Sequence, residues 1–221
     1  MRLLAIDTAL AACSAAVFDS KAGLVAAETL PMVRGHAEAL MPQIARVMAA
    51  AALDFSDIDR IAVTVGPGSF TGLRVGVSAA RGLALAADKP AVGVTTLTAL
   101  AAPLLAEDDS VPVIAVIDAR NDQAYMQAFG AGGRTLMSAK VAPLASALDV
   151  VPEGPVRLIG SAARKLAAHC PRATLVDDRA APDIVWVARI GIAASTDAPP
   201  KPLYLRAPGA QPQQIGHLLA R

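Results

Sequence analysis

The sequence is poor in aromatic residues, cysteine and histidine, and each shortage excludes a class of protein. Aromatic residues make up 3% of the 221 positions, so the core has to be built from aliphatic side chains, of which the 50 alanines are the largest group. The two cysteines, Cys13 and Cys170, form neither a disulfide framework nor a metal-type pair, and they suit a reducing cytosol. No HxxxH, HExxH, CxxC or GxSxG pattern occurs, which removes the common metalloprotease, redox and hydrolase motifs.

Charge and long apolar runs are also scarce. The formal net charge of +1 argues against a large basic surface for nucleic acid. Hydrophobic residues make up 54% of the chain, which argues against disorder, yet charges interrupt every apolar run before the roughly 18 residues of a membrane helix. The first apolar stretch ends at Asp7, too early for a signal peptide. We therefore expect a cytoplasmic globular protein.

The hydrophobic pattern predicts alternating strands and helices. Strands are expected at 3–6, 13–18, 24–30, 61–65, 91–94, 113–117, 124–129 and 156–159, and helices at 35–53, 69–87, 95–105, 163–169 and 183–194. An acidic break at 107–110 predicts a boundary between lobes 1–106 and 107–221, with a loose tail from about 207.

A weak internal repeat supports two lobes. Asp7 and Asp118 each end a strand, and in both cases another strand follows six residues later. The fold class is therefore predicted to be α/β with two related lobes.

The most informative segment is the glycine-rich turn Gly66-Pro67-Gly68-Ser69 between a predicted strand and a predicted helix. Backbone N–H groups at a helix start can hold an anion, and Ser69 is a good N-cap. The glycine spacing fits neither a P-loop nor a dinucleotide fingerprint. A structural turn is thus the favoured interpretation, with anion binding as the alternative.

The helix after this turn contains glycines at 72, 76 and 82, and an interior glycine costs roughly 1 kcal/mol relative to alanine. Close approach of a second helix, within the fold or from another chain, would offset that cost. The helix at 35–53 carries an apolar stripe of its own. The predicted partner surface comprises His36, Leu40, Ile44, Val47, Met48, Gly72, Val75, Gly76, Ala79, Gly82 and Leu83.

Isolated polar residues are weaker candidates for a ligand-binding or catalytic site. Asp7 and Asp118 are either metal or phosphate neighbours or turn-forming residues, and Arg120 could pair with Asp118. His36 fits a surface or capping residue better than a ligand. Nothing supports a nucleophile pair of Cys13 and His36 beyond the presence of both, and Cys13 is expected in the core.

Taken together, these segments resemble the bacterial TsaB family. Residues 66–76 match its central signature, and residues 4–17 and 34–42 match its start. Further matches are at 118–125 and 202–206. The resemblance implies an ASKHA-type fold of two duplicated lobes, each with a mixed sheet and helices.

The resemblance also implies a function. Members act in making N6-threonylcarbamoyladenosine at position 37 of tRNAs that read codons beginning with A. TsaB is a non-catalytic relative that dimerises with TsaD, while TsaE joins a larger complex and tRNA is contacted through that complex. The resemblance implies no intrinsic cofactor and no membrane association, and it places ATP or ADP near the junction with TsaD.

The residues agree with a non-catalytic member. In the register of TsaD, the two metal-binding histidines fall on Thr96 and Leu100, which cannot hold a metal tightly. The first loop, 7–10, lacks the glycine that lets a phosphate approach, so Asp7 and Gly160 are candidates for a vestigial nucleotide site. The alternatives are an active ASKHA phosphotransferase and a protease. An apolar helix pair that is meant for TsaD could also form a homodimer.

Overall fold

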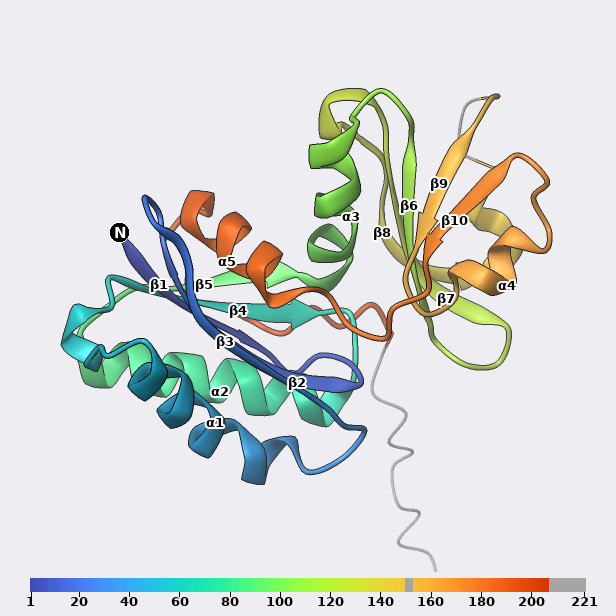
Figure 1. The fold of residues 1–221 in the computed structure, drawn as a ribbon. Coiled ribbons are helices and arrows are strands. Elements are labelled where there is room, and N and C mark those ends of the chain that lie inside the picture. The colour runs from blue at the N-terminus through green and yellow to red at the C-terminus, as the bar shows by residue number, and fades with distance from the viewer. Residues whose placement is uncertain (150–152, 207–221) are drawn as a thin grey trace, which may run out of the picture.

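Two five-stranded mixed sheets form the two lobes of the computed structural model, which describes residues 1–149 and 153–206 (Figure 1). The two-lobed α/β class expected from the sequence is thereby confirmed. The predicted loose tail from 207 lies outside the described residues.

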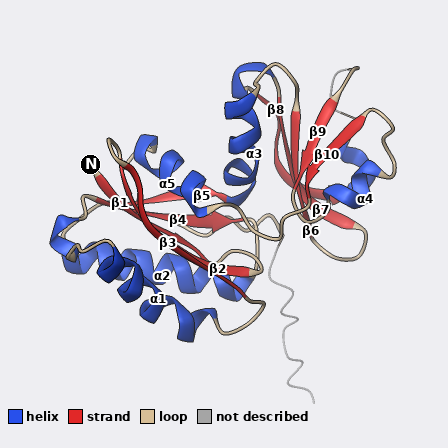
Figure 2. Ribbon diagram, in the orientation of Figure 1, coloured by secondary structure: helices blue, strands red, loops and turns tan. Residues whose placement is uncertain are grey.

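The first sheet has the order β3-β2-β1-β4-β5. Its strands are β1 (Arg2–Asp7), β2 (Ala12–Asp19), β3 (Gly23–Pro31), β4 (Arg60–Gly66) and β5 (Ala91–Thr95). The central β1 pairs antiparallel with β2 and parallel with β4. Helices α1 (His36–Ala50) and α2 (Phe70–Ala87) cover one face, and α5 (Ile184–Ala193) covers the other (Figures 1 and 2).

The second sheet repeats this arrangement strand for strand, in the order β10-β9-β6-β7-β8. Its strands are β6 (Val113–Asp118), β7 (Gln123–Phe129), β8 (Thr135–Pro143), β9 (Val156–Ile159) and β10 (Ala173–Asp177). Here β6 pairs antiparallel with β7 and parallel with β9, as β1 does with its neighbours. The repeat indicated by Asp7 and Asp118 is therefore a true duplication, while β8 and β10 were not predicted.

The helices of the second lobe are much shorter than those of the first. The 3-10 helix η3 (Leu144–Ala147) and α4 (Ala163–Ala167) take the places of α1 and α2 in the chain order. Two further short 3-10 turns, η1 (Phe55–Asp57) and η2 (Ala131–Gly133), precede β4 and β8.

Two helices cross between the lobes. Helix α3 (Thr96–Glu107) follows β5 but packs on β6, and α5 follows β10 but packs back on β1. The division into 1–106 and 107–221 therefore needs correction, because α5 and the segment after it return to the first lobe. Gly191 permits this packing, since a methyl group there would collide with Ala62.

The core is aliphatic, as the composition predicts. Separate apolar clusters lie under α1 and α2, under α5, around α3, and beside α4. Cys13 and Cys170 are both buried and free. Over 1–149 and 153–206, no helix is long and apolar enough to cross a membrane.

Candidate functional site

The glycine-rich turn joins β4 to α2 and has the structural role that the sequence favoured. Gly66 has φ +112, a conformation that L side chains rarely adopt. Ser69 is the N-cap, and its Oγ accepts the Gly72 N–H at 3.3 Å. The Ser69 N–H donates to the Ala9 carbonyl at 2.7 Å. That backbone donor is therefore used inside the lobe and does not face a ligand.

Gly68, Gly72 and Gly76 recur at every fourth position and face the loop after β1. A methyl group on Gly68 would collide with the carbonyl of Ala9, and on Gly72 or Gly76 with the carbonyl or hydroxyl of Thr8. The Thr8 hydroxyl also donates to the Gly72 carbonyl at 2.7 Å. These glycines allow close packing within the lobe.

The expectation that Gly72 and Gly76 contact another chain is therefore wrong, because both are buried against their own lobe. Gly82 differs from them. It is exposed, and an added methyl group there would meet open space.

The predicted interface on α1 needs the same correction. Leu40, Ile44, Val47 and Met48 are at most 4% exposed and belong to the core beneath the first sheet. His36 is also buried, with Nε2 3.2 Å from the carbonyl oxygen of Leu10. A periodic apolar stripe identifies the buried face of a helix, but it does not say whether the chain's own sheet or a partner covers that face.

The outer faces of α1 and α2 remain available for contact with a partner chain. Val75, Ala79 and Leu83, which were among the predicted interface residues, are half-buried and pack against the core cluster that α1 shares. On α1, four exposed residues recur at every fourth position, which sequence reasoning missed: Ala37, Met41, Ala45 and Ala49. The signal was present as a register of mostly small residues that runs beside the large apolar register.

Asp7 is fully buried beneath the same loop. Its Oδ1 accepts the Thr64 hydroxyl at 2.5 Å and the Ala9 N–H at 3.0 Å. Within the described part of the chain, Oδ2 is buried without a hydrogen-bond partner. Burial raises the pKa of this carboxyl, and the hydrogen bonds from Thr64 and Ala9 oppose the rise.

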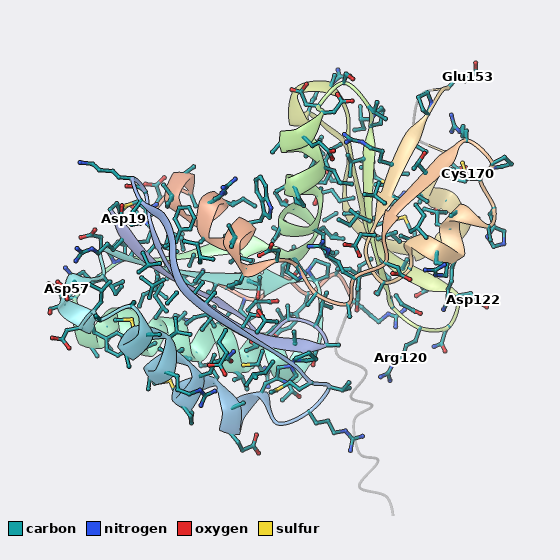
Figure 3. All side chains as sticks on the ribbon, viewed as in Figure 1. Asp19, Asp57, Arg120, Asp122, Glu153 and Cys170 are labelled. Carbon is teal, nitrogen blue, oxygen red and sulfur yellow. The ribbon has the colours of Figure 1, made fainter. Side chains whose placement is uncertain are left out.

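Asp118, at the equivalent place in the second lobe, makes the same hydrogen bond within its turn as Asp7, but its carboxyl contacts a lysine. Its Oδ1 accepts the Arg120 N–H at 2.8 Å, as Asp7 accepts that of Ala9. The Lys165 ammonium group donates to Oδ2 at 2.7 Å and lowers the pKa of Asp118. Lys165 therefore forms the ion pair that the sequence suggested for Arg120, and Arg120 adds a weaker electrostatic effect on Asp118 from the turn between β6 and β7 (Figure 3).

A cleft of about 470 Å³ opens between the two lobes beside the turn. It is lined by Ala9, Leu10, Gly68, Ser69, Phe70, Thr71, Ile117, Asp118, Ala119, Arg120, Tyr125 and Arg206. Neither Asp7 nor Gly160 lines it. Gly160 has φ +108, donates its N–H to Asp177 at 3.0 Å, and leaves no room for a methyl group beside Val116. The two residues proposed as a vestigial nucleotide site are thus structural and are not brought together.

The places that correspond to metal ligands lie inside the fold. Thr96 and Leu100 are 0% and 1% exposed on α3, and Leu100 packs with apolar residues of the second lobe. Across residues 1–149 and 153–206, no group of three or more His, Cys, Asp or Glu side chains could hold a metal ion. Cys13 is in the core, as predicted, and burial raises the pKa of its thiol to about 11.

The last described segment ties the lobes together at the cleft. The Leu203 N–H donates to the Val65 carbonyl at 2.7 Å in the first lobe. Arg206 donates to the Ala119 carbonyl at 3.2 Å in the second. Between them, the Tyr204 ring lies 5.1 Å from the Phe70 ring.

Two duplicated mixed-sheet lobes joined by crossing helices, with the glycine turn at their cleft, define a two-lobed α/β protein. The family model described as "TsaD: tRNA N6-adenosine threonylcarbamoyltransferase" matches residues 27–187. The chain belongs to this family and, by its relatives, to the TsaB proteins within it.

The relatives in sequence and structure cover different shares of this chain. TsaB of Escherichia coli is 39% identical over 57% of this chain and 53% of its own length, so the chain spans about half of that relative. An uncharacterised Mycobacterium tuberculosis protein, Rv3421c, is 32% identical over 96% of this chain and 95% of its own. The structure of YeaZ from Pseudomonas aeruginosa has a TM-score of 0.74 and 27% identity, covering 92% of this chain and 99% of that one.

Proposed function

We propose that this chain is a non-catalytic subunit in the formation of N6-threonylcarbamoyladenosine on tRNA, and that it acts by pairing with TsaD. The family match and the names of the TsaB relatives support the pathway. The observation that carries the non-catalytic part is the filled space around the first loop. Asp7 is fully buried, Thr8 is packed against Gly72 and Gly76 of α2, and the Ala9 carbonyl is packed against Gly68. The Asp7 carboxyl therefore has no surface that a phosphate or its metal could approach.

The outer face of α1 and α2 is the surface that we propose for TsaD. Small side chains at 37, 45 and 49 would let a partner helix approach closely, and Met41 is 47% exposed among them. Val75, Ala79 and Leu83 extend this face onto α2, and Gly82 adds an exposed position. Two helices from each chain would then pack as a four-helix arrangement.

Further parts of the proposal follow from the pathway. TsaE would join the larger complex, ATP or ADP would lie near the junction with TsaD, and the chain would order the surface around tRNA. The chain would then need no cofactor of its own.

The two alternatives have less support. A phosphotransferase would need Asp7 near a metal-bound phosphate, whereas Asp7 has no exposed surface. A thiol protease would need a nucleophile that ionises near neutral pH, whereas the pKa of Cys13 is about 11.

The test is reconstitution with TsaD. Tagged TsaD should retain this chain, and tRNA modification by TsaD with its other partners should fall when the chain is omitted. Ala45→Glu places a charge in the middle of the α1 stripe and should weaken TsaD binding at least tenfold without unfolding the chain, because Ala45 is exposed. Ala193→Glu, at an exposed position on α5 across the sheet, is the matched control. Normal TsaD binding by the Ala45→Glu variant would place the interface elsewhere.

A further inference from the structure

A cluster of two exposed aromatic rings and an arginine lies where α2 begins. Phe70 is 37% exposed and Tyr204 is 40% exposed, in a chain with only 3% aromatic residues. The Arg74 guanidinium lies 4.0 Å from the centroid of the Phe70 ring, and its Nε donates to the Tyr204 hydroxyl at 3.4 Å. This packing holds the three side chains in place at the surface, although none of them belongs to a core cluster.

The aromatic cluster connects two hollows that contain arginines. Phe70 lines the cleft between the lobes, together with Arg120 and Arg206. Tyr204 and Arg74 line a neighbouring groove of about 440 Å³, together with Arg81, which lies about two helical turns after Arg74. We call this continuous surface of Arg74, Arg81, Arg120, Arg206, Phe70 and Tyr204 the arginine strip.

The strip is predominantly positive, although Arg120 lies close enough to Asp118 to lower the pKa of that carboxyl. Within the described ranges, no carboxylate forms an ion pair with any of its four arginines. Asp118 is the acidic residue that lines the cleft, and it is paired with Lys165 at 2.7 Å. A chain with a net charge of +1 thus gathers four guanidinium groups along one path.

We propose that the arginine strip binds RNA directly, with the arginines on phosphates and the Phe70–Tyr204 pair offering a stacking surface to an unpaired base. Guanidinium groups flanking an exposed aromatic platform are the combination that single-stranded nucleic acids require. The inference rests on the proposed function, which supplies tRNA as the polyanion. A protein partner would be expected to need a larger apolar centre than this strip offers.

The strip lies mainly on a different flank of α2 from the surface proposed for TsaD, and the two meet where Arg81 and Gly82 line one hollow. Val75, Ala79 and Leu83 pack against the core cluster shared with α1. Arg74 and Arg81 instead line the groove with Pro202 and Tyr204, on another flank of α2. One helix could therefore serve both contacts at once.

The experiment measures binding of unmodified tRNA by fluorescence anisotropy, with the full chain alone and with its TsaD complex, over a series of salt concentrations. Arg74→Glu and Arg81→Glu should each weaken binding about tenfold, and should each lower the slope of log affinity against log salt by roughly 0.7 to 1. Phe70→Ala should weaken binding about 5- to 150-fold and leave the salt slope unchanged. The control is Arg134→Glu, at an exposed arginine directly after η2 and near the opposite end of β7, which should change neither quantity.

Each outcome decides the inference. Unaltered tRNA affinity in a folded Arg81→Glu variant would overturn it, while retention of TsaD by the same variant would leave the proposed function standing. Loss of TsaD binding with normal tRNA binding would make the strip a protein surface and would also overturn it. If the wild-type chain binds tRNA through the strip but never binds TsaD, the proposed function fails and the inference survives.

Discussion

At the scale of single residues, the glycines of α2 differ in whether their surroundings leave room for a side chain. Gly76 is needed because the Thr8 hydroxyl and the Val63 side chain leave no room for a methyl group. Gly82 has no atom within 4 Å of the place where its methyl group would lie. The same residue type in the same helix therefore serves packing at one position and costs helix stability at the other.

This difference predicts opposite effects for one substitution. Gly76→Ala should lower the free energy of unfolding by about 1–3 kcal/mol, because the added methyl group overpacks the seam with Thr8. Gly82→Ala should raise it by about 0.5–1 kcal/mol, because alanine is the better helix former and meets open space. Urea denaturation of the two variants checks both signs. Equal effects at the two positions would contradict the packing argument.

Asp7 predicts a pH dependence of stability. Its folded-state pKa is raised above the ordinary 3.8 by burial, so the folded chain holds this proton more tightly than the unfolded chain. The contribution of Asp7 to stability is therefore fully present below pH 3.8 and is lost as the pH rises through the folded-state pKa.

Asp7→Asn should remove this dependence, since asparagine imitates the protonated acid and still accepts from Thr64 and Ala9. The difference in unfolding free energy between variant and wild type should shift in favour of the variant as the pH rises. Chemical denaturation across the acid to neutral range measures it. A difference that shifts toward the wild type would mean that the carboxylate is stabilised in the folded state.

At the scale of elements, α1 has two apolar registers, and the exposed one lies about 100° around the helix from the buried one. The large residues at 40, 44, 47 and 48 cover the sheet, while the smaller register at 37, 41, 45 and 49 faces outward. Hydrophobic periodicity predicted the helix correctly, but the larger residues were assigned to the wrong partner. Burial of the large register leaves only the outer one for association.

The outer register predicts self-association of the isolated chain. Without TsaD, exposed Met41 and its neighbours should pair two copies, and Met41→Glu should return the chain to a monomer because a buried carboxylate would lack a partner. Light scattering behind size-exclusion chromatography measures the mass over a range of concentrations. The control is Val176→Glu, at an exposed apolar position on β10 of the other lobe. This variant should have the same measured mass as the wild type. Dimers that persist in the Met41→Glu variant would point to a different surface.

At the scale of the whole molecule, the two lobes have kept one topology and have diverged in their helices. Long α1 and α2 fill the outer side of the first lobe, whereas η3 and α4 leave the second lobe thin there. The acids at the ends of β1 and β6 diverged as well, one buried without an ion pair and one paired with Lys165. Asp7 is therefore not among the residues that line the cleft between the lobes.

This arrangement predicts little ATP turnover by the chain alone. The first loop is packed against α2 and lacks a phosphate-approach glycine, so hydrolysis should be slower than about 1 per second, the low end of ordinary enzymes. A phosphate-release assay on untagged protein measures it, and elemental analysis of the same preparation should find no stoichiometric zinc or iron. Turnover at enzymatic rates would favour the phosphotransferase.

The sequence alone determined most of the elements, the glycine-rich turn and the duplication, because these depend on short patterns. The apolar periodicity and the N-cap at Ser69 each span only a few positions, and the duplication is seen by comparing two such short patterns, at 7 and at 118. Irregular strands such as β8, and β10 with its exposed Val176, lack that local signal and were missed.

Only the tertiary structure decided what each surface faces. The cost of Gly76 was evident from the sequence, but its neighbour Thr8 lies 68 positions away and no local pattern names it. The return of α5 to the first sheet and the stacking of Tyr204 on Phe70 are likewise contacts between distant segments. Such contacts follow from how whole elements pack together, and that packing determines which glycines are structural and which arginines remain unpaired at the surface.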